Sequence, residues 1–275
     1  MSELVLSQGM LAIVAGLFGL SLGSFLNVCV FRWPEDESVV SPPSRCPGCD
    51  TPIAWRDNIP VFSWLLLRGR CRHCGMSISF QYPLVELATG LIWAGFFYRM
   101  GLEVEALRGA LFLTILFGIS LTDVRFYIIP DEFSLGGMVL GLALAPLAGG
   151  PTFLSALAGA AIGYFGFLIL GAGMTWVLKK FAPQRLEAAG VDQALGGGDV
   201  KMMGLVGAFL GPMGVPLTVF LGTVLGLLIF VPISLRTNKL IPFGIFLAVG
   251  AAATYGWGDS IMAWYTSEIL GIVSP

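Results

Sequence analysis

Two aspartates in this sequence stand at the ends of apolar stretches, where an ionisable side chain is costly to keep. Asp199 follows three glycines in the segment Gly196-Gly197-Gly198-Asp199-Val200-Lys201, immediately before an apolar run. Asp123 closes another apolar run, and at a helix C-terminus its charge would oppose the helix dipole. A carboxylate at the edge of a membrane segment needs a partner or a task. A flexible loop followed by a solvated capping Asp is the plain alternative for the first segment.

Two such aspartates, brought to the same depth in a membrane, could hydrolyse an amide bond. Because neighbouring carboxylates repel each other when both are ionised, the pair holds one shared proton. One member then acts as a base that activates water, and the other acts as an acid that polarises the scissile carbonyl. This chemistry needs neither a covalent intermediate nor a catalytic metal. It is expected at the cytoplasmic interface, where water is available and an apolar substrate helix can arrive from the lipid.

Four of the five cysteines form two pairs with the spacing of metal-binding knuckles. Cys46-Pro47-Gly48-Cys49 is followed, after 21 residues, by Cys71-Arg72-His73-Cys74. Four thiolates in two such knuckles suit a tetrahedral Zn²⁺, so Cys46, Cys49, Cys71 and Cys74 are the predicted zinc ligands. A redox pair is the alternative, and the cytoplasmic placement argues against disulfides. His73, the single histidine, is expected to be an exposed spacer.

The composition is that of a membrane protein, since 56% of the 275 residues are hydrophobic and 12% are charged. Each crossing needs about 20 apolar residues. Eight apolar spans are predicted, at residues 8–31, 84–100, 106–123, 133–149, 153–178, 200–214, 217–235 and 241–265. The sixth is short and ends at Gly211-Pro212, which is typical of a tilted, broken or buried segment. The expected fold is therefore an all-α polytopic membrane protein of about eight transmembrane helices.

A polar insertion divides the chain into three expected parts. Residues 1–31 form the first transmembrane helix, 32–83 a cytoplasmic four-cysteine zinc-binding lobe, and 84–275 the transmembrane core. Of the 15 Lys and Arg residues, all but Arg99 and Arg108 fall in or beside alternate connections. The positive-inside rule makes that set cytoplasmic and puts both termini outside. No basic residue precedes the first apolar run, so it is expected to be a spanning helix, not a signal peptide.

Other polar residues near the spans have both a structural and a functional interpretation. Asn27 needs hydrogen-bond partners inside an apolar helix, in which Gly19 and Gly23 suit close helix packing. Glu86 near the start of the next span complements a helix dipole or serves a site. Asp131 stands where an N-cap of the following span belongs.

Two polar segments on the expected cytoplasmic side need no catalytic role to explain them. The arginines before and within the second knuckle, Arg68, Arg70 and Arg72, suit an anionic lipid surface, and nothing in the sequence indicates nucleic acid as a partner. The loop 179–198 is expected to be a solvated connection, with a lid or a substrate contact as the alternative.

In this order, the motifs resemble those of the bacterial type IV prepilin peptidases, aspartic peptidases with a Gly-x-Gly-Asp motif. The resemblance covers nearly the whole chain. It includes Gly23-Ser24-Phe25-Leu26-Asn27-Val28, the paired Cys knuckles, Pro83-Leu84-Val85-Glu86, Asp123 with Ile129-Pro130-Asp131, the hexapeptide ending at Lys201, and Pro242-Phe243-Gly244.

The resemblance implies an enzyme of the bacterial inner membrane. It would cleave the short basic leader from type IV prepilins or type II secretion pseudopilins after a Gly. In bifunctional members the new N-terminal residue is then methylated by S-adenosylmethionine. The family's catalytic pair falls on Asp123 and Asp199, and its zinc cysteines fall on the four knuckle cysteines. Residues expected to support the site or the substrate are Asn27, Glu86, Gly196, Gly198 and Lys201.

The sequence departs from the family pattern at one visible position. After Pro242-Phe243-Gly244 the family commonly has Pro, and Ile245 stands here; only a local change at the start of the helix is expected. The methyl donor has no recognisable glycine-rich fold to bind, so it would need another surface. Members without the cysteine lobe tend to be peptidases only, and its presence favours the second activity.

The sequence leaves three alternatives to this interpretation. The chain is a peptidase without methyltransferase activity, a proton-coupled transporter whose carboxylates carry protons, or a non-catalytic zinc-ribbon scaffold. A transporter predicts charges near mid-span and interrupted helices in both halves. A scaffold leaves the two span-end aspartates unexplained. The key carboxylates cluster at one interface, which argues against the transporter, and a catalytic role explains them, which the scaffold does not. The peptidase is therefore favoured over these two other classes.

Overall fold

The computed structural model describes residues 2–147, 150–189, 191–237 and 242–271. The predicted cytoplasmic Lys239, the predicted span start Ile241 and the last residues of the 133–149 span lie outside the described residues. Within the described ranges, all regular elements are helices, and β-type pairing is limited to two isolated bridges, Arg45 with Pro52 and Arg70 with Ser77. The predicted all-helical class is confirmed.

Four of the described helices are long and apolar enough to cross a membrane. They comprise Gln8–Glu35, Val104–Phe126, Phe153–Phe181 and Gly197–Ile229. The other long helices are α3 (Gln81–Met100), α5 (Asp131–Leu144) and α9 (Gly244–Trp264). These three coincide with predicted apolar spans but are not among the four. The chain is thus a polytopic membrane protein by the length and composition of its helices.

The chain divides into two compact units, Met1–Thr114 and Ile115–Pro275, and α4 (Val104–Phe126) contributes to both. The first unit is built on α1 (Ser2–Arg32), which packs along α3. A Cβ at Gly19 would lie 2.8 Å from Trp93 Cβ, and one at Gly23 would lie 2.6 Å from Glu86 Cα. The two glycines therefore permit the close helix packing that the sequence predicts.

The segment between α1 and α3 carries the knuckles and has almost no apolar core. It contains the short helices η1 (Trp33–Glu35), η2 (Trp55–Asp57) and α2 (Phe62–Leu66). Between residues 36 and 79 only Cys46, Ser63 and Gly69 are buried. The Arg72 guanidinium binds both carboxylate oxygens of Asp57 at 2.6–3.0 Å and holds the pKa of that carboxyl below its usual range. So small a core needs an additional cross-link to stay folded.

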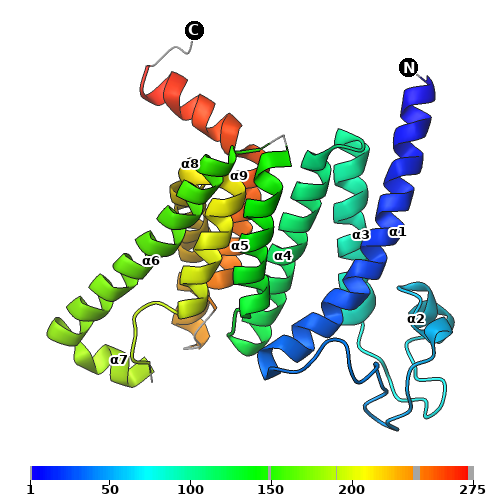
Figure 1. Cartoon of the computed structure of the whole chain (residues 1–275). Helices are drawn as coiled ribbons and strands as arrows, with labels where there is room; N and C mark the ends of the chain where they lie inside the picture. The colour runs from blue at the N-terminus through cyan, green and yellow to red at the C-terminus, as the bar shows by residue number, and fades with distance from the viewer. Residues whose placement is uncertain (1, 148–149, 190, 238–241, 272–275) are drawn as a thin grey trace. The chain divides into compact units, whose positions relative to one another are not determined.

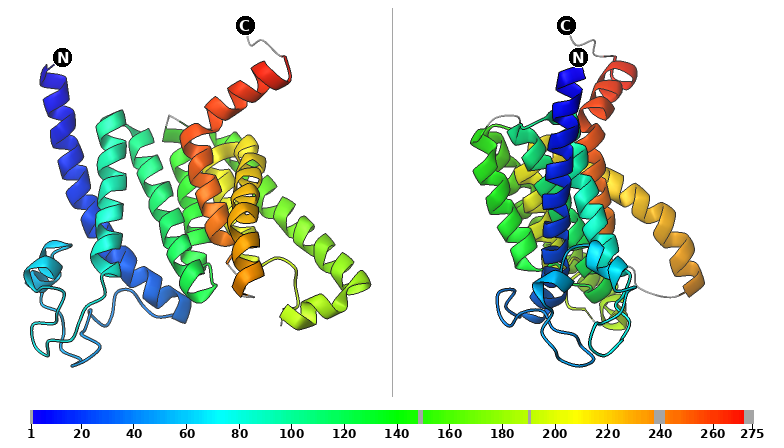
Figure 2. Two further views of the ribbon diagram at one scale, coloured as in Figure 1. Left: turned by 180° about the vertical axis from the view of Figure 1, so that it is seen from behind. Right: turned by 90° about the vertical axis from the view of Figure 1, so that its right-hand side faces the viewer.

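In the second unit α8 (Gly197–Thr237) packs against α5, α6 (Phe153–Phe181) and α9, as Figures 1 and 2 show. Its residues 202–209 are all buried, and the larger side chains among them are Met202, Met203, Leu205, Val206 and Phe209. The backbones of α6 and α8 are in direct contact. A Cβ at Gly163 would collide with the Met203 carbonyl oxygen, and one at Gly207 with the Gly159 carbonyl oxygen. Only residues without a side chain allow this approach.

Helix α8 is interrupted at Gly211, which has φ 73° and ψ −175°. This left-handed conformation is one that glycine adopts readily, and Pro212 follows it. The break lies where the sequence ends the sixth apolar span, so the prediction of a broken segment is confirmed. The expectation of a loop over 179–198 missed the short helix α7 (Pro183–Ala189), whose seven residues are too few to give a clear periodic pattern.

The contact between α6 and α8 generates a stability prediction. Gly163→Ala places a methyl group against the Met203 carbonyl and is expected to cost about 1–3 kcal/mol through overpacking. Thermal unfolding of the purified protein in detergent measures it. Gly166→Ala is the matched control, because Gly166 lies on the same helix with no atom within 4 Å of its Cβ position. Equal melting temperatures for the two variants would contradict the close approach.

Candidate functional site

Asp123 and Asp199 lie at the same end of the second unit. Helix α4 ends at Phe126, α5 begins at Asp131, α8 at Gly197 and α9 at Gly244. Figure 1 shows these four helix ends together at the lower edge of the unit. The chain direction of the apolar helices thus brings together two aspartates that are 76 positions apart in the sequence (199 − 123).

The first turn of α9 holds the carboxylate of Asp123. This side chain is only 6% exposed, and its Oδ2 accepts a hydrogen bond from the Ile245 N–H at 2.9 Å. The Gly244 N–H also donates to the carboxylate. A Cβ at Gly244 would lie 2.6 Å from Asp123 Oδ2, so the approach requires a glycine. Backbone N–H groups in the first turn of a helix have no intrahelical partner and suit an anion.

Asp199 sits in the first turn of α8, in contact with the glycines before it. The Gly196 N–H donates to its carboxylate, and a Cβ at Gly196 would lie 3.2 Å from Asp199 Oδ2. A Cβ at Gly198 would lie 2.9 Å from Ile129 Cβ. Gly198 therefore permits the close approach to Ile129, while a Cβ at Gly196 would make a tight contact with the Asp199 carboxylate.

Ile129 links the two segments that carry the aspartates. It is 9% exposed, it faces Gly198, and its Cδ1 would lie 3.0 Å from a Cβ at Gly244. Asp199 also interacts electrostatically with Asp123. The packing therefore joins both carboxylates into one site. Neither Ile129 nor Ile245 was predicted to support it, because each acts through apolar packing or its backbone, which leaves no polar signature in the sequence.

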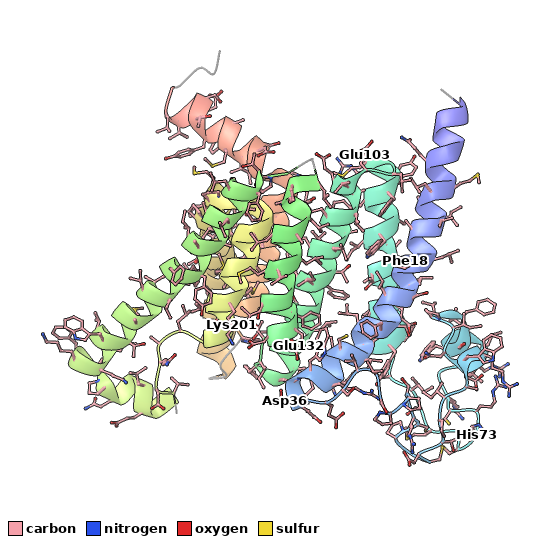
Figure 3. The ribbon with its side chains drawn as sticks, in the orientation of Figure 1. Phe18, Asp36, His73, Glu103, Glu132 and Lys201 are labelled. Carbon is pink, nitrogen blue, oxygen red and sulfur yellow. The ribbon has the colours of Figure 1, made fainter. Side chains whose placement is uncertain are left out.

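Lys201 forms an ion pair with Asp131 instead of entering the site as a free charge. Its Nζ lies 2.6 and 2.8 Å from the two carboxylate oxygens, and Figure 3 marks Lys201 near the lower end of α8. The prediction that Asp131 caps α5 is wrong. Pro130 occupies the N-cap, and Asp131 is the first helical residue, whose carboxylate turns to Lys201. The pair ties the first turn of α8 to the start of α5.

Asn27 and Glu86 belong to the first unit and lie in its α1–α3 interface. Glu86 is 7% exposed; its Oε2 accepts the Val61 N–H at 2.6 Å, and the Ser24 side chain also bonds to it. It lies beyond the first turn of α3, so the helix-dipole interpretation is wrong. Asn27 Nδ2 donates to the Tyr82 carbonyl at 3.1 Å, while its buried Oδ1 has no hydrogen-bond partner among the described residues.

The four knuckle cysteines come together as a compact cluster. Their sulfur atoms all lie within 4.8 Å of one another, with Cys46 3.7 Å from Cys74 and Cys49 4.0 Å from Cys71. All four are free thiols. A tetrahedron with metal–sulfur bonds of about 2.3 Å has sulfur–sulfur edges of about 3.8 Å, so the cluster fits Zn²⁺.

The electrostatics of the cysteine cluster also suit a metal. Backbone N–H groups of Cys74 and His73 donate to the Cys71 sulfur and lower the pKa of its thiol to about 6. Thiolates are the metal-binding form of cysteine. His73 itself is exposed, as the sequence predicts, and lies at the outer edge of the lobe (Figure 3).

Comparison with known proteins places these sites in a family. The family model described as Bacterial Peptidase A24 N-terminal domain matches residues 17–100, and that of the Type IV leader peptidase family matches residues 110–231. A protein of Aeromonas hydrophila named prepilin leader peptidase/N-methyltransferase is 33% identical over 282 residues, covering 92% of this chain and 93% of its own length. The chain belongs to the type IV leader peptidase family.

Further relatives with the same name support this family assignment. The protein of the same name from Bacillus subtilis is 30% identical over 263 residues, which cover 93% of this chain and 98% of that protein. The one from Myxococcus xanthus is 41% identical over 199 residues, which cover 72% of this chain and 56% of that longer protein. No solved structure matches the chain. Asp123 and Asp199 fall within the match to the leader peptidase model, and the knuckle cysteines fall within the match to the N-terminal domain.

The cysteine cluster predicts one zinc ion per chain. Metal analysis of the purified wild-type protein should find about one equivalent of zinc, and Cys46→Ser or Cys71→Ser should lose most of it because three sulfurs hold the ion less tightly. Cys29→Ser is the matched control, since Cys29 is buried in α1 apart from the cluster. Absence of zinc from the wild type would contradict the assignment.

Proposed function

We propose that this chain is an aspartic peptidase of the bacterial inner membrane. It removes the basic leader from type IV prepilins or type II secretion pseudopilins after a Gly. It then methylates the new N-terminal residue with S-adenosylmethionine. The names of its relatives support both activities. The observation that carries the peptidase is the meeting of Asp123 and Asp199 at one end of one unit, each with backbone N–H donors.

The two carboxylates divide the work of hydrolysis. One takes a proton from water, whose oxygen attacks the carbonyl carbon of the Gly, and the other, protonated, donates a hydrogen bond to the carbonyl oxygen. The tetrahedral intermediate collapses when the first carboxyl group passes the proton it took from water to the leaving nitrogen, and the C–N bond breaks. The backbone donors of Gly196, Gly244 and Ile245 hold the two side chains in register, so little reorganisation is needed during the reaction.

We place the cut at the cytoplasmic face of the membrane. In this arrangement the chain crosses the bilayer about eight times, with residues 1–31 as the first transmembrane helix and 84–275 as the core. Both termini lie on the periplasmic side, and the 32–83 lobe is cytoplasmic. The distribution of Lys and Arg supports this orientation. The shared end of α4, α5, α8 and α9 is then the cytoplasmic end, where water reaches the pair.

Zinc has a structural role in this proposal. Cys46, Cys49, Cys71 and Cys74 would hold the ion, and it supplies a cross-link for a lobe with almost no apolar core. S-adenosylmethionine supplies the methyl group. A transporter accounts less well for the site. Both carboxylates lie at the same end of the second unit and accept hydrogen bonds from backbone N–H groups, whereas the carboxylates of a proton-coupled transporter are expected near mid-span, along the route of the proton.

Single replacement of either catalytic aspartate should abolish leader cleavage. Asp123→Asn and Asp199→Asn each remove the acid or the base, so the rate should fall by at least about 100-fold. Mass spectrometry of a prepilin incubated with the purified enzyme reports the cut, and unchanged zinc content and melting temperature report folding. Asp259→Asn, at the exposed far end of α9, serves as the control. Cleavage at wild-type rate by either variant would eliminate the proposed mechanism.

The Ile245 N–H generates a second prediction on activity. Ile245→Pro removes the donor to Asp123 while keeping a bulky apolar residue, so cleavage should slow by about tenfold, the value of one hydrogen bond to a charged group. Ile245→Val keeps the N–H and should cleave within about twofold of wild type. The two variants are compared by initial rates on the same prepilin. Equal rates for both would show that the Ile245 N–H does not assist Asp123.

A further inference from the structure

A second polar cluster lies in the α1–α3 interface of the first unit. Ser24 of α1 bonds to Glu86 of α3, and Asn27, one turn further along α1, donates to the carbonyl of Tyr82, one turn before Glu86 on α3. Gly23 makes this possible, because any side chain there would collide with the Glu86 backbone. Asn27 is 2% exposed and Glu86 is 7% exposed. The cluster is thus almost fully removed from water.

The cluster has more hydrogen-bond acceptors than donors. The Glu86 carboxylate receives the Val61 N–H and the Ser24 hydroxyl, and no cation pairs with it among the described salt bridges. Asn27 Oδ1 receives no hydrogen bond from the described residues. A buried acceptor without a donor costs free energy, and a buried carboxylate without a cation costs more. A ligand that brings N–H groups would satisfy both.

Val61 holds a strained position over this cluster. Its φ of 60° is unfavourable for a β-branched residue. It lies in a tight turn in which the Phe62 N–H donates to the Pro60 carbonyl, and its own N–H donates to Glu86 at 2.6 Å. Strained backbone of this kind is concentrated at functional sites. A ligand N–H that takes the place of the Val61 N–H on Glu86 would leave this turn free to change its conformation.

Methylation of an amine requires what this cluster provides. After leader cleavage the new N-terminus is an ammonium group, and its nitrogen has no lone pair until it loses a proton. A buried carboxylate attracts the ammonium and can accept that proton, and an amide oxygen beside it can orient the remaining N–H groups.

Resting on the methyltransferase half of the proposed function, we propose that Glu86 and Asn27 bind the α-amino group exposed by leader cleavage. The ammonium takes the place of the Val61 N–H on Glu86 and donates a second hydrogen bond to Asn27 Oδ1. Glu86 then accepts one proton. The nitrogen lone pair attacks the sulfonium methyl of S-adenosylmethionine, so that an N–C bond forms and the S–C bond breaks. The sulfur keeps that electron pair and leaves as a neutral thioether.

The position of Val61 couples this site to the zinc lobe. Val61 lies between the two knuckles, and Ser63 fixes its segment by donating to the Arg56 carbonyl at 2.9 Å and accepting the Ile59 N–H at 3.0 Å. Loss of zinc would release that segment from Glu86. The lobe is therefore required for methylation in this proposal, while the aspartate pair in the second unit is built without it.

Glu86→Gln tests the site, because it preserves shape and removes the base. The assay uses the full-length enzyme, S-adenosylmethionine and two peptides, a prepilin and the same sequence already cut, with a free N-terminus. We expect leader cleavage within about threefold of wild type and methylation, read as a mass gain of one methyl group, lowered by at least about 100-fold. Glu103→Gln, at an exposed glutamate of the same unit, should retain both activities.

The same variant distinguishes a structural role from the proposed one. The Gln amide oxygen can still accept the Val61 N–H, so a purely structural cluster would leave methylation and melting temperature unchanged, and that outcome overturns the proposal. Equal loss of cleavage and methylation overturns it as well. Binding of S-adenosylhomocysteine, measured by calorimetry, should be unchanged in Glu86→Gln. Its loss would assign the cluster to the amino group of the methyl donor, which also overturns the proposal.

Binding to the wild-type enzyme gives a readout independent of variant folding. The cut peptide with a free amine should compete with methylation of a labelled peptide at least about tenfold better than its N-acetylated form, which carries no charge. Equal competition would overturn the proposal. If the wild type cuts and methylates prepilin and Glu86→Gln still methylates it, the proposal of an amine-binding site at Glu86 is contradicted, while the proposed function of the protein stands. If the wild type does neither, the proposed function fails.

Discussion

The end of the second unit that holds Asp123 and Asp199 depends on backbone groups that approach where side chains are absent. Gly163 and Gly207 let α6 and α8 touch along their backbones, and Gly250 does the same for α9, where a Cβ would lie 2.7 Å from the Gly222 nitrogen. Because a membrane interior offers little hydrophobic gain for helix association, such contacts are the main source of packing energy. The same device recurs at the site, where Gly244 admits the Asp123 carboxylate. Helix packing and the geometry of the aspartate pair therefore have one physical basis.

Much of this arrangement could be predicted from the sequence, because its signals are local. The apolar spans mark the helices, with α3, α5 and α9 near their predicted ranges, and Gly211-Pro212 marks the break in α8. Asp123 and Asp199 are conspicuous because carboxylates rarely border apolar runs. The cysteines are conspicuous because paired knuckles have few other uses. Each of these inferences needs only a short window of residues.

The remainder depends on contacts between distant segments. Asp131 follows a proline at a helix start and fits a cap, but its partner Lys201 is 70 positions away. Glu86 fits a helix dipole, yet its donor Val61 reaches it only because the lobe folds back with a left-handed residue. Ile245 was expected to change only the start of its helix, whereas it supplies a hydrogen bond to Asp123. No pattern of residue types records such pairings.

The Ile245 contact has an evolutionary consequence, because its donor is a main-chain atom. Every genetically encoded residue except proline carries a main-chain N–H. A substitution at position 245 by any residue other than proline therefore keeps the N–H that donates to Asp123, whatever the size or polarity of the new side chain. Replacement by the imino acid deletes the contact outright. A proline at this position would leave the Gly244 N–H as the donor to Asp123 from the first turn of α9.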